Sequence, residues 1–434
     1  MRIIWTEVHY MFSLRSLALV ISSWPLVAAA QPAAKPEDAG MSTERLKRIH
    51  ESIQRHVDAG EICGAVTVVA RRGVVVHFEA HRLMDIESKK PMEKDTIFRK
   101  ASMTKPITGV AVLMLVEEGK IRLNDPVSKF LPEFRDMKVA MPRERAAGAA
   151  PAPGAAAALD FYTVPANREI TVQDLLTHTS GLVSTVSGGF GAKLAATMAP
   201  HGPGDTLASY VPKLATIPLD FQPGTQWAYS GAAGPEVLSR IVEIVSGQTY
   251  DEFLRTRIFE PLGMKDTFFY PPDDRRPRLV TLYRKSPNGL EKDANQDGFS
   301  NKTYFGGGGG LMSTAADYLQ FAQMLLNGGE LNGKRLLGPR TVELMASNHV
   351  GDMFNGKLGR PAHGMGFGLI VQVVEDNVAA GLRVSNGSFG WDGAFGTQVW
   401  VNPKEKMVTV IMIQTQVAQV QRDFENAVMQ AIVE

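Results

Sequence analysis

The chain has 434 residues, 44% of them hydrophobic, and its 46 basic side chains nearly balance its 45 acidic ones, for a formal charge of +1. A chain of this length and composition buries one large core or two smaller ones. A nucleic-acid-binding protein carries a pronounced basic patch or stripe, and no long run of one charge sign occurs here. We therefore expect a folded protein whose partner is a small molecule and not a nucleic acid.

Residues 1–30 have the pattern of an export signal. An apolar run at residues 17–27 follows a basic residue and closes on three alanines ending at Ala30, a small-residue cleavage pattern. The run is too short and too interrupted to span a bilayer. The first ten residues suit a signal badly, so both Met1 and Met11 are candidate start positions. Cleavage after Ala30 predicts a periplasmic or secreted protein without a stable membrane anchor.

Periodicity predicts helices at both ends and through the middle of the chain, with strands only near the ends. The helical patterns fall at residues 42–57, 102–116, 235–247, 250–263, 314–329 and 416–434. The strand-like runs fall at residues 64–82, read as a hairpin turning at Arg71-Arg72-Gly73, and at 364–374, 396–403 and 406–414. Thr314 and Asp317 form a capping pair that predicts where the fifth of these helices begins.

Strand-rich ends around a helical middle predict an α/β (α+β) fold. One antiparallel sheet is built from both termini and flanked by helices, rather than from alternating βαβ units. We expect residues 31–100 and 305–434 to form this sheet domain and residues 101–304 to form an inserted all-helical domain. An Ala/Pro/Gly-rich stretch near 143–160 is expected to be a mobile insertion. The cleft between the two domains is the expected site.

Ser102 and Lys105 lie three positions apart where an apolar helix is predicted to begin, so both side chains share one face of its first turn. Pro106 fits only near a helix start, because it lacks an amide hydrogen. The free amides of that turn favour negative charge on the serine oxygen, and burial would lower the proton affinity of the lysine. This pattern predicts a serine nucleophile activated by a lysine. The spacing also arises by chance, and Ser102 as a simple N-cap stays an alternative.

Two later stretches strengthen the prediction of a serine nucleophile. PGTQWAYSGAAG places Tyr229 in a turn-rich loop before a helix, and SFGWDGAFGTQVWVNP places Trp391-Asp392-Gly393 at the edge of a strand. In this order and spacing, the three motifs resemble those of the serine β-lactamase and penicillin-binding protein superfamily. They resemble most closely its class C-type branch and the family VIII carboxylesterases. The stretches LLTHTSGL, LMSTAADY and GTQVWVNP resemble the same branch, and the resemblance covers residues 41–432.

The resemblance implies a role for each residue. Ser102 would attack an acyl carbon, and Tyr229, as a phenolate stabilised by Lys105, would accept the serine proton and later activate water. A free tyrosine ionises near pH 10, so Lys105 would have to lower that pKa considerably. The backbone amides of Ser102 and Ala394 would form the oxyanion hole, and Trp391 would line the substrate pocket.

Two departures from the β-lactamase pattern bear on the substrate. In β-lactamases of this branch the third motif resembles Lys-Thr-Gly, and its lysine cation faces the carboxylate of the substrate. In this chain Trp391 stands at the position of that lysine, with Asp392 next to it. A charged hydrogen bond is worth about 1.5 to 3 kcal/mol, so its loss weakens carboxylate substrates roughly 10- to 150-fold. Gly231 stands where an asparagine would hold the substrate amide. With Gly393 and Phe395, these residues form a candidate pocket suited to an ester with an apolar acyl group.

We therefore predict a carboxylesterase that cleaves esters of short to medium acyl chains through an acyl-serine intermediate, with weak β-lactam and especially cephalosporin hydrolysis as a side activity. The enzymatic alternatives are a class C-type β-lactamase and a D-amino-acid peptidase. The alternative from another class is a non-catalytic penicillin-recognising binding module, which would bind without turnover. No cofactor is expected, and the sequence leaves the oligomeric state open.

Other chemical signals are weaker. No G-x-S-x-G match offers another nucleophile, and the nine histidines show no H-E-x-x-H or other zinc spacing, so we expect no metal. Cys63 is the only cysteine, which excludes a disulfide within the chain. DANQDGF, beginning at Asp293, imitates half of a calcium loop but has Tyr304 where a glutamate belongs. His178 is expected to be structural, with a contact at the pocket rim as the alternative.

Overall fold

The computed structural model describes residues 35–143, 161–184, 189–195, 202–296 and 301–434. Residues 35–434 form one compact unit. The expected export signal at residues 1–30, nearly all of the expected insertion near 143–160, and the end of the calcium-like stretch lie outside the described residues.

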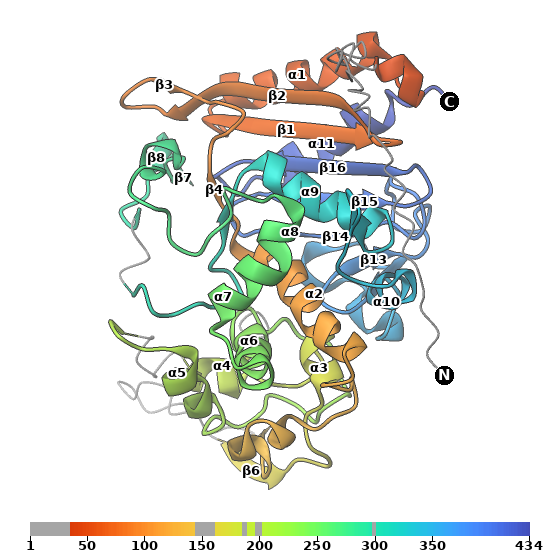
Figure 1. Cartoon of the computed structure of the whole chain (residues 1–434). Coiled ribbons are helices and arrows are strands. Elements are labelled where there is room, and N and C mark those ends of the chain that lie inside the picture. Colours follow the sequence, from red (N-terminus) through yellow and green to blue (C-terminus); the bar gives the residue numbers. More distant parts are fainter. Residues whose placement is uncertain (1–34, 144–160, 185–188, 196–201, 297–300) are drawn as a thin grey trace, which may run out of the picture. The chain divides into compact units, whose positions relative to one another are not determined.

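The helices are distributed along the whole of the described chain (Figure 1). They are α1 (Thr43–Asp58), α2 (Thr104–Glu117), α3 (Val172–Leu176), α4 (Phe190–Ala195), α5 (Leu207–Leu214), α6 (Ala233–Ser246), α7 (Tyr250–Leu254), α8 (Glu260–Leu262), α9 (Ala315–Leu326), α10 (Pro339–Met345) and α11 (Ala418–Met429). Among the described residues, none of these helices has the length and apolar character needed to cross a membrane.

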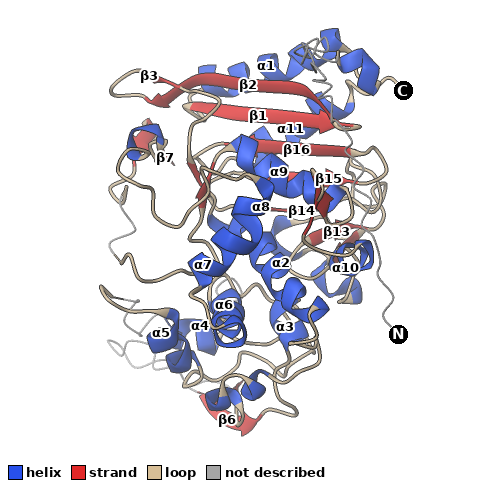
Figure 2. Ribbon diagram, viewed as in Figure 1, coloured by secondary structure: helices blue, strands red, loops and turns tan. Residues whose placement is uncertain are grey.

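Eight strands form the main sheet, in the order β12-β13-β14-β15-β16-β1-β2-β3, and every neighbouring pair is antiparallel (Figure 2). Their bounds are β1 (Gly64–Arg71), β2 (Val74–Asp85), β3 (Lys90–Pro91), β12 (Met365–Phe367), β13 (Gln372–Val374), β14 (Phe389–Asp392), β15 (Gln398–Asn402) and β16 (Met407–Met412). The short two-stranded pairs are β4 (Phe98–Arg99) with β9 (Met312–Ser313), β5 (Lys138–Pro142) with β6 (Phe161–Pro165), β7 (Tyr283–Ser286) with β8 (Gly289–Lys292), and β10 (Glu330–Leu331) with β11 (Lys334–Arg335).

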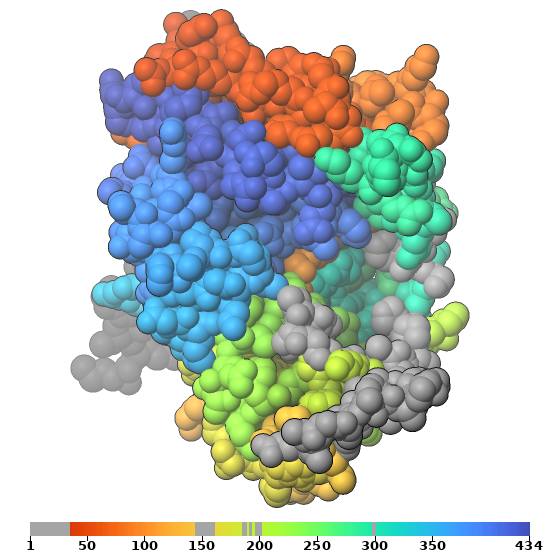
Figure 3. Space-filling model, turned by 180° about the vertical axis from the view of Figure 1, so that it is seen from behind, coloured from red at the N-terminus to blue at the C-terminus, as the bar shows by residue number. Residues whose placement is uncertain are grey.

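The two ends of the described unit meet in the middle of this sheet. β16, from the carboxyl-terminal part, pairs with β1, so that Val66 lies opposite Met412 and Val68 opposite Val410. This pairing confirms the predicted antiparallel sheet built from both termini and flanked by helices. Figure 3 also shows the red amino-terminal residues beside the blue carboxyl-terminal ones, where α1 packs on α11.

The alternation of side chains in β1 divides the core into two layers. Ala65 and Val69 pack with α1 and α11 on one face of the sheet, and Val66 and Val68 pack into the larger core on the other face. That larger core contains α2, which is buried from Thr104 to Leu115. A helix that is apolar all round is stable only inside a core, so α2 holds the residues at its start in a fixed position beneath the sheet.

Several boundaries differ from the sequence-based expectation. Ser102 does not begin the α-helix but lies in the 3-10 turn η2 (Ala101–Met103), two residues before the first residue of α2. The run at 364–374 is not one strand, because Gly368 bonds back to Val371 and separates β12 from β13. The middle of the chain contains the short strand pairs β5–β6 and β7–β8, which the helical patterns did not reveal.

Candidate functional site

Ser102 sits in a segment held from two sides. The amide of Lys100 donates to the carbonyl of Leu311 (2.9 Å), and the amide of Leu311 donates to the side-chain oxygen of Thr104 (3.2 Å). Ala101, directly before the serine, adopts a positive φ of 44°, which is uncommon for a residue with a side chain. The surrounding structure therefore holds the serine in a tight turn rather than in a relaxed helix start.

The structure brings Ser102, Lys105 and Tyr229 together. The hydroxyl of Tyr229 donates to the Ser102 Oγ (2.6 Å), and the Lys105 Nζ lies 3.0 Å from the same oxygen. Lys105 comes from the first turn of α2, and Tyr229 comes from the loop before α6, 127 positions after the serine. Both groups that could exchange a proton with the serine therefore already lie at hydrogen-bond distance.

Lys105 is fully buried, and its Nζ also donates to the carbonyl of Gly308 (2.6 Å). Burial lowers the pKa of Lys105 to about 7, while the carboxylates of Glu236 and Asp392 partly oppose this shift. Near neutral pH the amine therefore exists in both forms and has a lone pair to offer in one of them.

The pKa of Tyr229 shifts upward, whereas the sequence-based expectation was that Lys105 would lower it. Burial raises the pKa of Tyr229 above its usual value of 10, although the hydrogen bond to Ser102 and the indole of Trp391 both act to lower it. The ring lies 4.9 Å from His178 and 5.7 Å from Trp391, between ring centroids. In this apolar aromatic setting the tyrosine keeps its proton at neutral pH, so its side chain is a phenol rather than a phenolate.

His178 packs against the ring of Tyr229. It is 1% exposed, its Nδ1 accepts a bond from the amide of Ser230 (3.3 Å), and its ring also contacts Trp227 and Phe367. Burial lowers the pKa of His178 well below its usual value, so the ring stays neutral. The histidine is thus a packing residue next to Tyr229 and does not lie at the pocket rim.

The third motif lies at the same place and brings in a residue that sequence reasoning missed. Trp391, on β14, is 1% exposed, and Asp392 pairs with Arg360. The guanidinium of Arg360 also lies 5.7 Å from the centre of a Trp391 ring. The segment at 351–364 has no chemical motif of its own, so its sequence offered no signal that an arginine reaches this point.

The turn after β14 packs directly against the serine segment. A Cβ built on Gly393 would lie 2.3 Å from the carbonyl oxygen of Lys100, so only a glycine allows this approach. Ala394, the expected second donor of the oxyanion hole, is exposed in the turn between β14 and β15, and Phe395 is half-buried beside it. The close contact at Gly393 places this turn next to the residues that precede Ser102.

The glycine run at 306–310 brings backbone close to the same residues. A Cβ on Gly308 would lie 2.9 Å from the carbonyl oxygen of Gly231, and a Cβ on Gly307 would lie 2.0 Å from the Ser239 Oγ. Gly231 is therefore beside the carbonyl that accepts from Lys105. Burial also raises the pKa of Glu236 to about 7, and this carboxyl, on α6, is a second titratable neighbour of Lys105 that the sequence did not indicate.

Comparisons with known proteins agree with this geometry. The family described as Beta-lactamase matches residues 49–434. Protein Rv1367c of Mycobacterium tuberculosis is 37% identical over 371 residues, covering 84% of this chain and 88% of that protein. Esterase EstB of Burkholderia gladioli is 31% identical over 399 residues, covering 86% and 91%.

A solved structure gives the same result. The structure described as "EstCE1, a hydrolase with promiscuous acyltransferase activity" superposes with a TM-score of 0.73 at 28% identity, over 89% of this chain and 99% of that one. The similarity of the fold and the similarity of the sequence therefore agree. The chain belongs to the beta-lactamase superfamily of serine hydrolases, on a branch similar to the family VIII esterases.

Proposed function

We propose that this protein is a carboxylesterase that cleaves esters of short to medium acyl chains through an acyl-enzyme on Ser102. The observation that carries the proposal is the pair of short distances from the Ser102 Oγ, 2.6 Å to the Tyr229 hydroxyl and 3.0 Å to the Lys105 Nζ. The similarity to Esterase EstB supports an ester as the substrate.

In the first step, neutral Lys105 accepts the proton of Ser102 while the Oγ forms a bond to the acyl carbon. The amides of Ser102 and Ala394 are the proposed donors to the oxyanion that develops on the carbonyl oxygen. As the ester C–O bond breaks, the Tyr229 hydroxyl donates its proton to the leaving alkoxide and is reprotonated by the ammonium of Lys105. Water then releases the acid by the same steps in reverse, with its proton passing to the tyrosine and lysine pair.

In this proposal the base is Lys105 and not a Tyr229 phenolate. The raised pKa of Tyr229 favours a neutral tyrosine, and the lowered pKa of Lys105 favours a lysine that loses its proton near pH 7. Glu236 and Asp392 lie close enough to raise the pKa of Lys105 against the larger effect of burial. In the proposal these two carboxyl groups keep the lysine pKa near the operating pH, and so act as positioning residues.

A neutral ester fits the proposed pocket better than a carboxylate substrate. The side chain of Trp391 is buried, but its ring packs beside that of Tyr229 and keeps the surroundings of the serine apolar. The cation that lies over the Trp391 ring, Arg360, is already paired with Asp392. A carboxylate substrate would have to draw Arg360 away from that partner. This is also the observation that favours a second candidate, a β-lactam hydrolase, in which Arg360 would take the place of the missing motif lysine.

The test is a set of turnover assays on purified protein, each repeated with Ser102→Ala. p-Nitrophenyl acetate, butyrate and octanoate are compared with nitrocefin and a D-Ala-D-Ala peptide. We expect ester cleavage that is fastest for the shorter chains, slow nitrocefin turnover, and loss of all activity in the variant.

Residual ester cleavage by Ser102→Ala would remove the serine from its role. Nitrocefin turnover faster than ester turnover would support the β-lactam hydrolase, and a stable covalent adduct without turnover would support a binding module. Circular dichroism of the variant controls for folding, since Ser102 is only partly buried and its loss leaves no large cavity.

A further inference from the structure

A second cluster of chemically capable side chains lies on the α1 and α11 face of the sheet. His77, Glu79 and His81 alternate along β2, so all three side chains point to the same face, and His50 reaches them from α1. The strand register places Glu79 opposite Thr67 and His81 opposite Ala65. The pattern His-x-Glu-x-His has the two-residue period of a strand, which differs from the spacing of a helical zinc motif.

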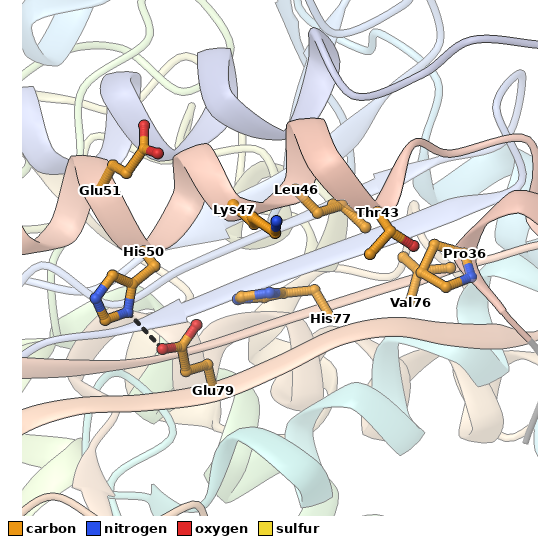
Figure 4. A pocket seen from close by; sticks show the side chains of 9 residues that line it. All are labelled: Pro36, Thr43, Leu46, Lys47, His50, Glu51, Val76, His77 and Glu79. Atoms are coloured by element: carbon orange, nitrogen blue, oxygen red, sulfur yellow. Dashed lines mark hydrogen bonds and ion pairs between the residues drawn. The ribbon is translucent and has the colours of Figure 1, made fainter.

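The ligand atoms of three of these residues are close together. The Nδ1 of His50 lies 2.5 Å from the Glu79 Oε1 (Figure 4), and the Nδ1 of His81 lies 3.7 Å from the same oxygen. All three atoms lie within 4.8 Å of one another. Ligand atoms around a tetrahedral Zn²⁺ at about 2.0–2.2 Å stand about 3.3–3.5 Å apart. The side chains of His50 and Glu79 are 53% and 36% exposed, so they can shift from their present distances to the spacing that a tetrahedral ion requires.

His81 offers an unused lone pair in a buried position. Its side chain is 2% exposed, and among the described residues its Nδ1 has no hydrogen-bond partner. Its Nε2 lies 2.9 Å from the Thr67 Oγ1, and the Nε2 of His77 lies 2.7 Å from the same oxygen. One hydroxyl donates to only one ring, so the other ring donates to it. With His81 as that donor, its Nδ1 keeps the lone pair and faces Glu79.

A second-sphere bond of this kind is the usual way in which a protein orients a metal-binding imidazole. A metal ion binds the neutral imidazole, in which one ring nitrogen carries the proton and the other keeps its lone pair. The cation of Lys47, which lines the same pocket, is held by Glu44 on its own helix (2.6 Å).

The cluster opens to solvent through a pocket of about 500 Å³ lined by His50, His77 and Glu79 together with residues of α1 (Figure 4). Three protein ligands and an accessible pocket leave one position of a tetrahedral ion for water. We propose that His50, Glu79 and His81 form a site for a divalent transition metal of the Zn²⁺ class, with Thr67 orienting His81. The site joins α1 to β2, whereas α2, which follows Ser102, packs in the core on the other face.

The test uses the full chain without a histidine tag, dialysed against a chelator and titrated with zinc chloride by calorimetry. We expect one Zn²⁺ per chain. His50→Ala should weaken binding at least about 10-fold, and Thr67→Val, which keeps the side-chain shape, should weaken it by about 10- to 100-fold. His363→Ala removes an exposed histidine elsewhere and should leave the affinity unchanged.

Equal affinities of the wild type and His50→Ala, or the absence of any saturable heat, would overturn the site. His50 is exposed on α1, so the variant is expected to fold, and its melting temperature in chelator verifies this. Ester turnover by His50→Ala should match the wild type, so a failure of the metal site and a failure of the proposed function are separate outcomes. The melting temperature of the wild type should rise with zinc and that of His50→Ala should not.

Discussion

Burial shifts the pKa values of Lys105 and Tyr229, the two residues proposed to exchange protons with Ser102, in opposite directions. The pKa of Lys105 falls to about 7 because the charged ammonium loses its hydration, and the pKa of Tyr229 rises because the charged phenolate would lose its own. Both shifts favour the neutral pair. A neutral amine next to a neutral phenol is thus the state from which the proposed reaction starts.

This state predicts the pH dependence of catalysis. Protonation of Lys105 removes the base, so kcat/KM should fall as the pH drops through about 7 and should level off above it. The measurement is the initial rate of p-nitrophenyl acetate cleavage from pH 5 to 9, with the Ser102→Ala rate subtracted as the background. Lys105→Arg, which keeps a charge but offers no base, should lower kcat/KM by about 10²- to 10⁴-fold.

A rate that keeps rising towards pH 10 would contradict the lysine as the base and would return that role to a Tyr229 phenolate. Near-normal turnover by Lys105→Arg would contradict any proton transfer at position 105. Thermal melting of the variant at each pH separates these results from unfolding, because Lys105 is fully buried.

At the scale of the element, the turn between β14 and β15 is the part that positions the proposed oxyanion donor. Gly393 approaches the carbonyl of Lys100 so closely that any Cβ would overlap it, and the Thr397 Oγ1 lies equally close at 2.3 Å from that Cβ. The strands on either side fix where this turn begins and ends. The distance between the serine segment and the turn is therefore set by the absence of one side chain.

Gly393→Ala should push the turn, and the amide of Ala394 with it, away from Ser102. We expect kcat for p-nitrophenyl butyrate to fall by about 10²- to 10³-fold, the usual loss for one oxyanion donor, with a smaller change in KM. Gly202→Ala is the matched control, since its Cβ would have 3.9 Å of space and lies outside the turn. An unchanged kcat in folded Gly393→Ala would show that the turn does not set the oxyanion geometry.

The elements also show how far sequence reasoning reaches. The hairpin at β1 and β2, the α9 start at Thr314 and the sheet built from both ends follow from local periodicity and capping, and the structure confirms them. The capping pair itself is only half formed, because the Asp317 carboxylate accepts from the amide of Asp266 instead of from its own helix start.

The parts that escaped prediction depend on contacts between distant segments. Arg360 comes from a loop without periodicity, and its partner Asp392 lies 32 positions later, on a strand separated from β12 by β13. The direction of the Tyr229 pKa escaped for the same reason, because it depends on the burial contributed by His178 and Trp391. The proximity of Ser102 and Lys105 could be predicted from the sequence because the two residues are only three positions apart.

At the scale of the whole molecule, residues 35–434 form a single compact unit, and its first element is the short turn Pro36–Ala39. The proposed export signal ends before this unit. The predicted cleavage after Ala30 would leave a mature chain of 434 − 30 = 404 residues, which contains the whole of this unit.

The prediction is that protein recovered from the periplasm or medium of a Gram-negative host begins at Gln31. Intact-mass measurement and amino-terminal sequencing of the exported protein check this, and a version lacking residues 1–30 should stay in the cytoplasm with normal ester turnover. An exported chain that retains its first 30 residues would contradict the proposed cleavage.

The pairing of β1 with β16 has a consequence for the timing of synthesis. Met407 follows its partner Arg71 by 407 − 71 = 336 positions. At about 5–20 residues per second, a ribosome needs roughly 17 to 70 s to make that stretch. For all of that time β1 has one strand partner, β2, and one open edge, because the strand that closes the centre of the sheet has not yet been made.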